Sequence, residues 1–431
     1  MQRTVPTIAV AGAGLRGRGY AARIREAGGA RIVAVAEPDP ARRARFAAEH
    51  GLAPERTFPG WREMAARGRP ADAVIIATQD AEHAGPAVRF AGLGCHILLE
   101  KPMATSEAGA LRVVEAVERA GVMLAVCHVM RYTEYTRALR RLIEDGRIGA
   151  PVSVQHLEPV GWWHHAHSYV RGNWRRADES GPMLMTKSCH DVDWLIHVMG
   201  EAPARVSSFG RLSHFRPEER PPGAAGRCVD CAVEARCPYS ATRLYLSCLG
   251  DPARETWPLG AVTDDRTEAG VLRALREGPY GRCVYACDND VVDHQVVNME
   301  FPSGATGVFT MTAFAAAAPR QTRVFGTSGC LEGDGLRITV RDFVTGGTEI
   351  VEPGGVPREG ASDGRHDLDD DALADAFVAA LVAGDPALLS SGPRESLASH
   401  RVVWAAERAR LNRAVIELDP RSSPAKGTVS T

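Results

Sequence analysis

A glycine-rich loop between an apolar run and a helical pattern constrains the fold of this chain most. Residues 7–11 form an apolar run typical of a buried strand, and residues 20–27 have the pattern of a helix. Glycines between a strand and a helix allow a tight turn and let the backbone approach a pyrophosphate at the helix N-terminus. We therefore expect a dinucleotide to bind the loop that joins the two, at Gly12, Gly14, Leu15, Arg16 and Gly17.

A glutamate follows the second apolar run, where such folds bind the adenosine ribose. Residues 31–36 form this run, and Glu37 lies 20 residues after Gly17. A carboxylate here accepts a hydrogen bond from the ribose 2′-hydroxyl and repels a 2′-phosphate, which favours NAD over NADP. Arg42 and Arg43 keep NADP open, although a solvated helix face is their more ordinary interpretation.

Apolar runs continue to alternate with helical patterns up to about residue 130. This alternation predicts a doubly wound parallel sheet, the Rossmann arrangement, in a domain of residues 1–130. Ligands of such sheets bind beyond the carboxyl ends of the strands, where this chain has Thr78, His83, Glu100 and Lys101. A lysine in a cleft without water loses proton affinity and can act as an acid or base. A solvated Glu100–Lys101 pair closing a turn is the alternative.

These motifs resemble the Gfo/Idh/MocA family of oxidoreductases, named for glucose-fructose oxidoreductase, inositol dehydrogenase and rhizopine catabolism. The matching segments are the glycine loop, Ile76-Ala77-Thr78 with His83, Glu100-Lys101-Pro102 and Arg131-Tyr132. The resemblance implies that Lys101 contacts a substrate hydroxyl, that Arg131 lies at the substrate, and that Pro102 shapes the nicotinamide pocket. It also implies an α+β C-terminal domain with a largely antiparallel open sheet, whose faces cover the sugar site and build a homo-oligomer.

A second group of chemically active residues lies in the predicted C-terminal domain, residues 131–415. Thr186 and His190 are four residues apart in a helical pattern, so they share one face. Family members usually have an acid where Thr186 stands. Its absence leaves His190 as the expected general base and substrate contact, with Lys101 as partner and Lys187 as a further catalytic candidate. A hydrogen-bonded core histidine is the structural alternative for His190.

An aromatic and basic stretch, residues 162–176, is expected to contact a sugar. Aromatic faces stack on the apolar faces of sugar rings, and arginine serves hydroxyls or anions. We select Arg171 and Trp174 as substrate contacts. For His164, His165 and His167 an ordinary surface loop explains the sequence equally well.

Residues 210–290 depart from the compact family pattern and carry a cysteine cluster. Cys228, Cys231 and Cys237 fall within this Pro-, Gly- and Arg-rich insertion. A Cys-x₂-Cys pair with a third cysteine nearby is typical of a tetrahedral structural zinc. The sequence does not fix the fourth ligand, and Cys283, in a tight segment flanked by glycine, is our first choice. Reduced thiols in a loop are the alternative.

Charge and hydropathy exclude several classes of partner. The formal net charge is -2, and no apolar run approaches the ~18 residues of a spanning helix, so neither nucleic acid nor membrane is an expected partner. The N-terminus lacks the pattern of a signal peptide, so we expect a cytoplasmic location with reduced cysteines. The Ser/Pro/Lys-rich tail, residues 416–431, is expected to be disordered.

The sequence therefore predicts an NAD-dependent oxidoreductase that acts by hydride transfer on a hydroxyl of a sugar, sugar acid or cyclitol. The alternative resembles relatives that are glycoside hydrolases, which oxidise a ring hydroxyl transiently, eliminate the aglycone, add water and reduce again. The missing acid at Thr186 and the insertion keep this alternative open. A cofactor-binding regulator without turnover is a third class, against which the intact Glu100-Lys101-Pro102 argues.

Overall fold

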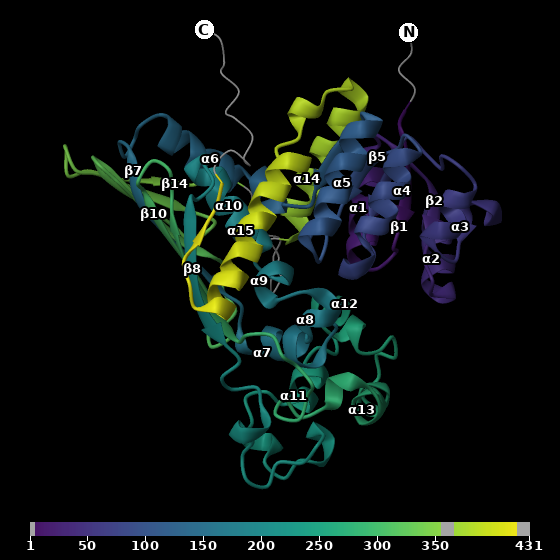
Figure 1. The fold of residues 1–431 in the computed structure, drawn as a ribbon. Helices are drawn as coiled ribbons and strands as arrows, with labels where there is room; N and C mark the ends of the chain where they lie inside the picture. Colours follow the sequence, from purple (N-terminus) through teal and green to yellow (C-terminus); the bar gives the residue numbers. More distant parts are fainter. Residues whose placement is uncertain (1–4, 355–365, 420–431) are drawn as a thin grey trace.

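The computed structural model describes residues 5–354 and 366–419, which contain two sheets (Figure 1). Sheet A has six parallel strands in the order β3-β2-β1-β4-β5-β6. Its strands are β1 (Thr7–Ala11), β2 (Arg31–Ala36), β3 (Thr57–Phe58), β4 (Ala73–Ile76), β5 (His96–Leu99) and β6 (Leu124–Val126). The prediction of a doubly wound parallel sheet is confirmed.

Helices cover both faces of sheet A, which is why its central strands are apolar without alternation. They include α1 (Leu15–Ala27), α2 (Pro40–His50), α3 (Trp61–Ala66), α4 (Ala84–Gly92) and α5 (Glu107–Ala120), with 3₁₀ turns at Pro54–Arg56, Asp80–Glu82 and Val129–Tyr132. One face packs on Phe90 and Val113, the other on Ile24 and Phe377. Phe377 belongs to α14 (His366–Ala383), so a helix within the predicted C-terminal domain completes the core of the first.

Sheet B has nine strands in the order β14-β13-β12-β11-β7-β10-β9-β8-β15. They are β7 (Pro151–Pro159), β8 (Arg205–Arg211), β9 (His294–Glu300), β10 (Thr306–Thr312), β11 (Gln321–Gly326), β12 (Gly329–Gly333), β13 (Ile338–Asp342), β14 (Thr348–Val351) and β15 (Ile416–Glu417). All neighbours are antiparallel except β7 and β10, which confirms the expected largely antiparallel sheet.

The tail prediction is wrong where it overlaps the described chain. Ile416 and Glu417 pair with β8, and the backbone is ordered to Asp419, because β15 extends the edge of sheet B. Residues 420–431 of that prediction lie outside the described residues.

Helices pack on one face of sheet B and leave its other face open (Figure 1). The covering helices include α6 (Glu134–Glu144), α10 (Cys189–Met199) and α15 (Pro393–Asn412). The shorter elements of this half of the chain are α7 (Trp162–His165), a π-helix Ala166–Arg171, α8 (Ala177–Ser180), α9 (Met183–Thr186) and a 3₁₀ turn Pro386–Leu388. Strand β9 shows the resulting alternation, with Val297 and Met299 buried in the core under the helices.

The cysteine-rich insertion connects β8 to β9 and forms a separate lobe at the bottom of Figure 1. Its elements are α11 (Ala241–Leu246), α12 (Pro252–Thr256), α13 (Glu268–Glu277) and 3₁₀ turns at Pro217–Glu219, Cys228–Asp230, Glu234–Arg236, Leu259–Ala261 and Pro279–Gly281. A small core of Tyr245, Leu259, Val271 and Leu275 supports it. Within the described ranges, no helix is both long enough and apolar enough to cross a bilayer.

Candidate active site

The glycine loop between β1 and α1 has the shape that a bound pyrophosphate requires. Gly12 has φ +94°, and a Cβ there would overlap the Ala77 carbonyl, while a Cβ at Gly17 would overlap the Gly12 carbonyl. At Gly14 a Cβ would meet nothing within 4 Å, so the loop is open on its outer side. Helix α1 has neither a side-chain cap nor an acidic residue in its first turn. Its first N–H groups therefore fit an anion.

Glu37 lies beside this loop at the end of β2. Its side chain is 3% exposed, accepts a hydrogen bond from the Ala13 N–H at 2.9 Å, and pairs with Arg42 at 3.0 Å. Arg43 donates to the main-chain carbonyl of Glu37. The carboxylate is thus fixed at the adenosine end of the predicted cofactor site, with one arginine directly upon it.

Glu100, directly after β5, and Arg16, at the start of α1, bind each other at the carboxyl edge of sheet A. Glu100 Oε1 accepts hydrogen bonds from Arg16 Nε at 2.7 Å and from the Tyr20 hydroxyl at 2.9 Å. Arg16 also pairs with Asp370 of α14. Burial alone would raise the pKa of Glu100, but Arg16 and Lys101 outweigh it and lower that pKa. Both residues therefore brace the end of β5 against α1, whereas Leu15 of the same loop is 54% exposed.

His83 connects the segments that follow β4 and β5. It is buried, with Nδ1 2.6 Å from the Pro102 carbonyl and Nε2 3.1 Å from the Thr78 carbonyl. Thr78 and Lys101, which both follow strands of sheet A, are thereby held in fixed relation to each other.

Lys101 reaches from sheet A across to the second domain. Its Nζ donates to the Thr186 carbonyl at 2.5 Å, at the end of α9. His190 lies one helical turn further on, in the first turn of α10. The seam between the domains therefore brings together Lys101 and His190, the two proton-active residues selected from the sequence.

His190 is held as a neutral imidazole. Arg320 donates to its Nε2 at 2.8 Å, while Nδ1 is buried without a partner among the described residues. Burial lowers the pKa of His190 well below its usual range, and Arg320, Lys101 and Lys187 lower it further against Asp191. Because Arg320 donates to Nε2, the proton of the neutral ring belongs on Nδ1.

A buried ladder of alternating charges supports His190. Lys187 Nζ lies 3.3 Å from Glu158, Arg320 Nε lies 3.0 Å from Glu158, and Arg320 also pairs with Asp191. The arginine keeps the pKa of Asp191 well below its usual range although burial opposes this. Such ion pairs fix geometry more than they add stability. Sequence analysis missed Glu158 and Arg320, because they lie on β7 and before β11, far from the motifs.

Trp174 also lies at the seam, where it binds an acid that sequence analysis did not select. Its indole Nε1 donates to Asp80 Oδ2 at 2.9 Å, and its ring stacks on Tyr169 with centroids 5.9 Å apart. Burial raises the pKa of Asp80, against the opposing effects of His83, Lys101 and the indole. Its position two residues after Thr78, at the carboxyl edge of sheet A, was the available signal.

The two arginines predicted to bind substrate are held by acceptors of the protein itself. Arg131 forms a bidentate pair with Asp193 at 2.6 and 2.7 Å and donates to the Ser390 carbonyl. Arg171 donates to the carbonyls of Arg282 and Tyr239 in the insertion. A buried guanidinium needs hydrogen-bond acceptors within the protein, and in both arginines carboxylate or carbonyl oxygens of the protein accept from it.

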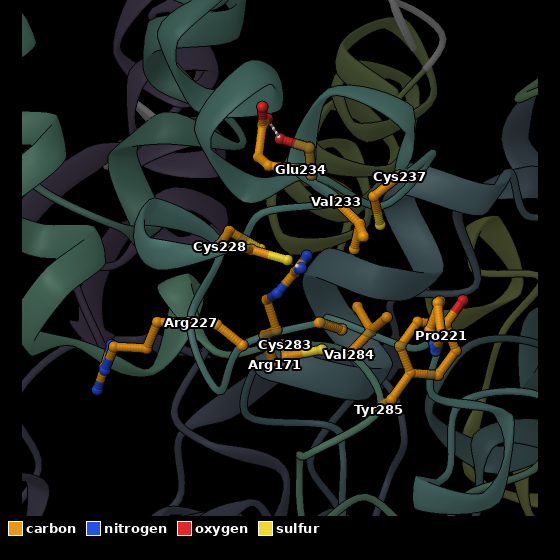
Figure 2. A pocket seen from close by; sticks show the side chains of 14 residues that line it. Arg171, Pro221, Arg227, Cys228, Val233, Glu234, Cys237, Cys283, Val284 and Tyr285 are labelled. Atoms are coloured by element: carbon orange, nitrogen blue, oxygen red, sulfur yellow. Dashed lines mark hydrogen bonds between the residues drawn. The ribbon is translucent and has the colours of Figure 1, made fainter.

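The four selected cysteines line one small cavity in the insertion, together with Arg171 (Figure 2). These are Cys228, Cys231, Cys237 and Cys283. Across the part of the chain that the structure describes, no three His, Cys, Asp or Glu side chains are already arranged to hold a metal ion. The cavity is thus a site of gathered thiols, separate from the seam.

Two family profiles match most of the chain. One, described as an oxidoreductase family with an NAD-binding Rossmann fold, matches residues 7–128, and its C-terminal alpha/beta counterpart matches residues 140–418. The chain belongs to the Gfo/Idh/MocA oxidoreductase family. Its NAD-binding domain is therefore the one that contains the glycine loop, Glu37 and Lys101.

Curated relatives of this Gfo/Idh/MocA protein match over part of their length. It is 27% identical over 290 residues to the putative oxidoreductase YteT of Bacillus subtilis, covering 65% of this chain and 64% of the relative. It is 31% identical over 147 residues to the 2,7-anhydro-N-acetylneuraminate hydratase of Escherichia coli, covering 34% of this chain and 38% of the relative. The chain thus spans less than two thirds of either relative.

Solved structures share the fold over nearly the whole chain. An oxidoreductase from Agrobacterium radiobacter, in complex with NAD+, L-tartaric acid and magnesium, superposes with a TM-score of 0.69 at 17% identity. The match covers 96% of this chain and 98% of that one. This chain therefore shares its overall fold with that solved structure. In this chain the cysteine-rich lobe lies between β8 and β9.

Proposed function

We propose that this chain is an NAD-dependent oxidoreductase that acts on a hydroxyl-bearing carbon of a sugar, sugar acid or cyclitol. Residues 1–130 bind the cofactor, and residues 131–415 supply most of the substrate site. The observation that carries the proposal is the contact of Lys101 with the Thr186 carbonyl, because it joins the cofactor domain to the helix start that holds His190. The family membership and the sugar named for one relative support the substrate class.

The residues of the first domain fit NAD. The open N-terminus of α1 and the uncovered Gly14 suit a pyrophosphate, and Glu37 suits a ribose with a free 2′-hydroxyl. NAD when bound exchanges a hydride with the substrate carbon at its nicotinamide ring. Thr78 and His83 fix the strand ends at this edge of sheet A, and Glu100 with Arg16 anchors the backbone that presents Lys101.

Lys101 and His190, at the seam, have different roles in proton transfer. Lys101 accepts the proton that leaves the substrate hydroxyl. His190 donates its Nδ1–H to an oxygen of the substrate, since Arg320 already occupies Nε2. Lys187 holds Glu158, and through it Arg320, in place. Positioned acid–base groups of this kind typically contribute about 10²–10⁴ in rate.

Substitution of Lys101 tests this proposal. Lys101→Ala and Lys101→Arg should both retain NAD binding and lose about 10²–10⁴ in turnover, because alanine has no basic group and arginine stays protonated and cannot accept a proton. Turnover is followed by NADH absorbance over a panel of sugars, sugar acids and cyclitols, and NAD binding by calorimetry. Near-normal turnover in Lys101→Arg would contradict the assignment of Lys101 as the proton acceptor.

A redox-cycling glycoside hydrolase is the second candidate function. Thr186 stands where an acid is usual, and one relative is named as a hydratase of an anhydro sugar, a reaction with no net oxidation. Release of an aglycone from nitrophenyl glycosides without net NADH would support this candidate. Stoichiometric NADH from free sugars would support the dehydrogenase.

Two finer properties accompany the proposal. We propose self-association through the open face of sheet B, where Phe209, Val296, Thr310 and Leu157 form one row across four strands and Phe209 is 66% exposed. Light scattering of wild type and Phe209→Glu tests it, and an unchanged mass would contradict it.

We also propose a cytoplasmic location, which suits the ten free cysteines.

A further inference from the structure

We propose that Cys228, Cys231, Cys237 and Cys283 bind one structural zinc ion inside the insertion. The site lies apart from Lys101 and His190 and is independent of the proposed activity. Four thiolates complete a tetrahedral shell and leave no position for a substrate, so the role of the ion is structural.

The fold of the insertion brings these cysteines together from separate turns. Cys228 begins one 3₁₀ turn and Cys231 follows it, while Cys237 and Cys283 follow two others. The Cys283 N–H donates to the Gly226 carbonyl at 2.9 Å, which joins the segment before Cys228 to the segment around Cys283. Backbone contacts between residues about 55 apart in sequence therefore gather the four thiols around one cavity.

The cavity between the cysteines has the size of a single ion. Its volume is about 20 Å³, room for about one water-sized sphere. Figure 2 shows Cys228 and Cys237 pointing inward from opposite sides. The insertion's other two cysteines, Cys248 and Cys287, do not line the cavity.

Arg171 supplies the strongest indication of negative charge in the cavity. It is 1% exposed, its Nη2 lies 3.5 Å from Cys228 Sγ, and its Nη1 has no partner among the described residues. Its acceptors besides Cys228 are the main-chain carbonyls of Arg282 and Tyr239, so with neutral thiols none of these contacts would supply a counter-charge to this buried cation. Zinc with four thiolates carries a net charge of about -2, which Arg171 balances in part.

Elemental analysis of the full chain, purified without added metal or chelator, tests the proposal. Wild type should contain about one zinc per chain and no iron. Cys231→Ser should lose most of the zinc and melt at a lower temperature. Cys248→Ala is the matched control, a buried cysteine of the same insertion outside the cavity, and it should keep its zinc.

A second measurement needs no variant and stays informative if Cys231→Ser does not fold. Alkylation of native wild type, read by mass spectrometry, should spare the four cysteines together and modify them together after chelation. Zinc near zero with full thermal stability would overturn the proposal. So would iron in place of zinc, zinc retained in Cys231→Ser, or independent alkylation of the four thiols.

Discussion

The carboxyl edge of sheet A and the cysteine cavity both place reactive side chains, but they do so by different means. At the edge, Thr78 and Lys101 each follow a strand whose apolar residues are fully buried in a large apolar core. In the insertion, the cysteines lie on short turns over a small core that includes Tyr245 and Leu275. Apolar burial positions the first set, whereas a few polar contacts position the second.

This difference determines how each region should respond to substitution. Apolar packing distributes its free energy over many contacts, so no single polar side chain holds the edge of sheet A. A lobe with a small apolar core depends on individual buried polar groups, and the loss of any one of them lowers its free energy of unfolding substantially. The two regions meet at residues 166–174, where the π-helix that carries Arg171 leads to Trp174 at the seam.

Arg171→Met should have the largest effect, because it removes a buried cation on which the insertion depends. The carbonyls of Arg282 and Tyr239 lose their donor, and each buried acceptor left unpaired costs about 1–3 kcal/mol. Chemical denaturation should show a lower free energy of unfolding with unchanged NAD affinity in the folded fraction. Arg175→Met is the control, since its pairs are solvent-exposed and worth about 0–1 kcal/mol. Equal losses in both variants would contradict the comparison.

Acid should destabilise the boundary between the regions, where histidines are buried uncharged. Burial lowers the pKa of His165 to about 4 and that of His167 to about 3. The unfolded chain takes up protons below the ordinary histidine pKa of about 6.5, while the folded chain does not. Stability is therefore full above about pH 6.5 and falls toward pH 4, by about 1.4 kcal/mol per pH unit for each histidine.

His165→Phe separates this effect from general acid unfolding. Both ring nitrogens of His165 lack partners among the described residues, and the ring packs between Tyr169 and Phe215. The phenyl ring keeps the stacking and removes one titrating group. Between pH 7.5 and 5.5 the variant should lose about 1 kcal/mol less stability than wild type, measured as denaturation midpoints. An identical pH dependence would show that His165 does not contribute.

The two regions also differ in how far the sequence predicted them. The glycine loop, Glu37 and Lys101 belong to local motifs in which strand, turn and helix are adjacent, so their placement follows from the order of elements. Arg171 was assigned to the substrate because its aromatic neighbours suit a sugar. Its acceptors, on Tyr239 and Arg282, lie far away in sequence and give no local signal.

The same limit applies to His190. Its place on α10 near Lys101 was predictable from the family motifs, but its protonation was not. Arg320, 130 residues away, donates to Nε2 and so leaves the proton of the neutral ring on Nδ1. Sequence periodicity locates a side chain on a face; the charge of that side chain depends on partners that only the folded chain brings near.

Glu37→Ser should narrow the preference for NAD over NADP by about tenfold, the equivalent of about 1.4 kcal/mol. The change removes the carboxylate that faces a 2′-phosphate and frees Arg42 to bind it. Dissociation constants for both cofactors measure the ratio. Glu49→Ser in the same domain is the control, because Glu49 pairs with Arg18 on the surface. Tighter binding of NADP than NAD by wild type would contradict our interpretation of this strand end.

Trp174→Phe should have the smallest effect. It tests whether the hydrogen bond from Trp174, at the boundary between the two regions, to Asp80 affects turnover at the seam. The phenyl ring keeps the contact with Tyr169 and loses the indole N–H that binds Asp80. A hydrogen bond of this kind contributes about 1 kcal/mol net, so kcat/KM should fall by about fivefold. The loss should appear mainly in KM if Asp80 binds substrate, and mainly in kcat if Asp80 orients Lys101.

Trp162→Phe is the matched control for this measurement. Trp162 is 38% exposed, and its indole donates to the Pro238 carbonyl in the insertion, away from Asp80. Its loss should leave both constants unchanged. If Trp162→Phe and Trp174→Phe reduce kcat/KM equally, the effect comes from the packing of the lobe as a whole. In that case the insertion acts on the seam through its stability, and the bond between Trp174 and Asp80 has no separate role.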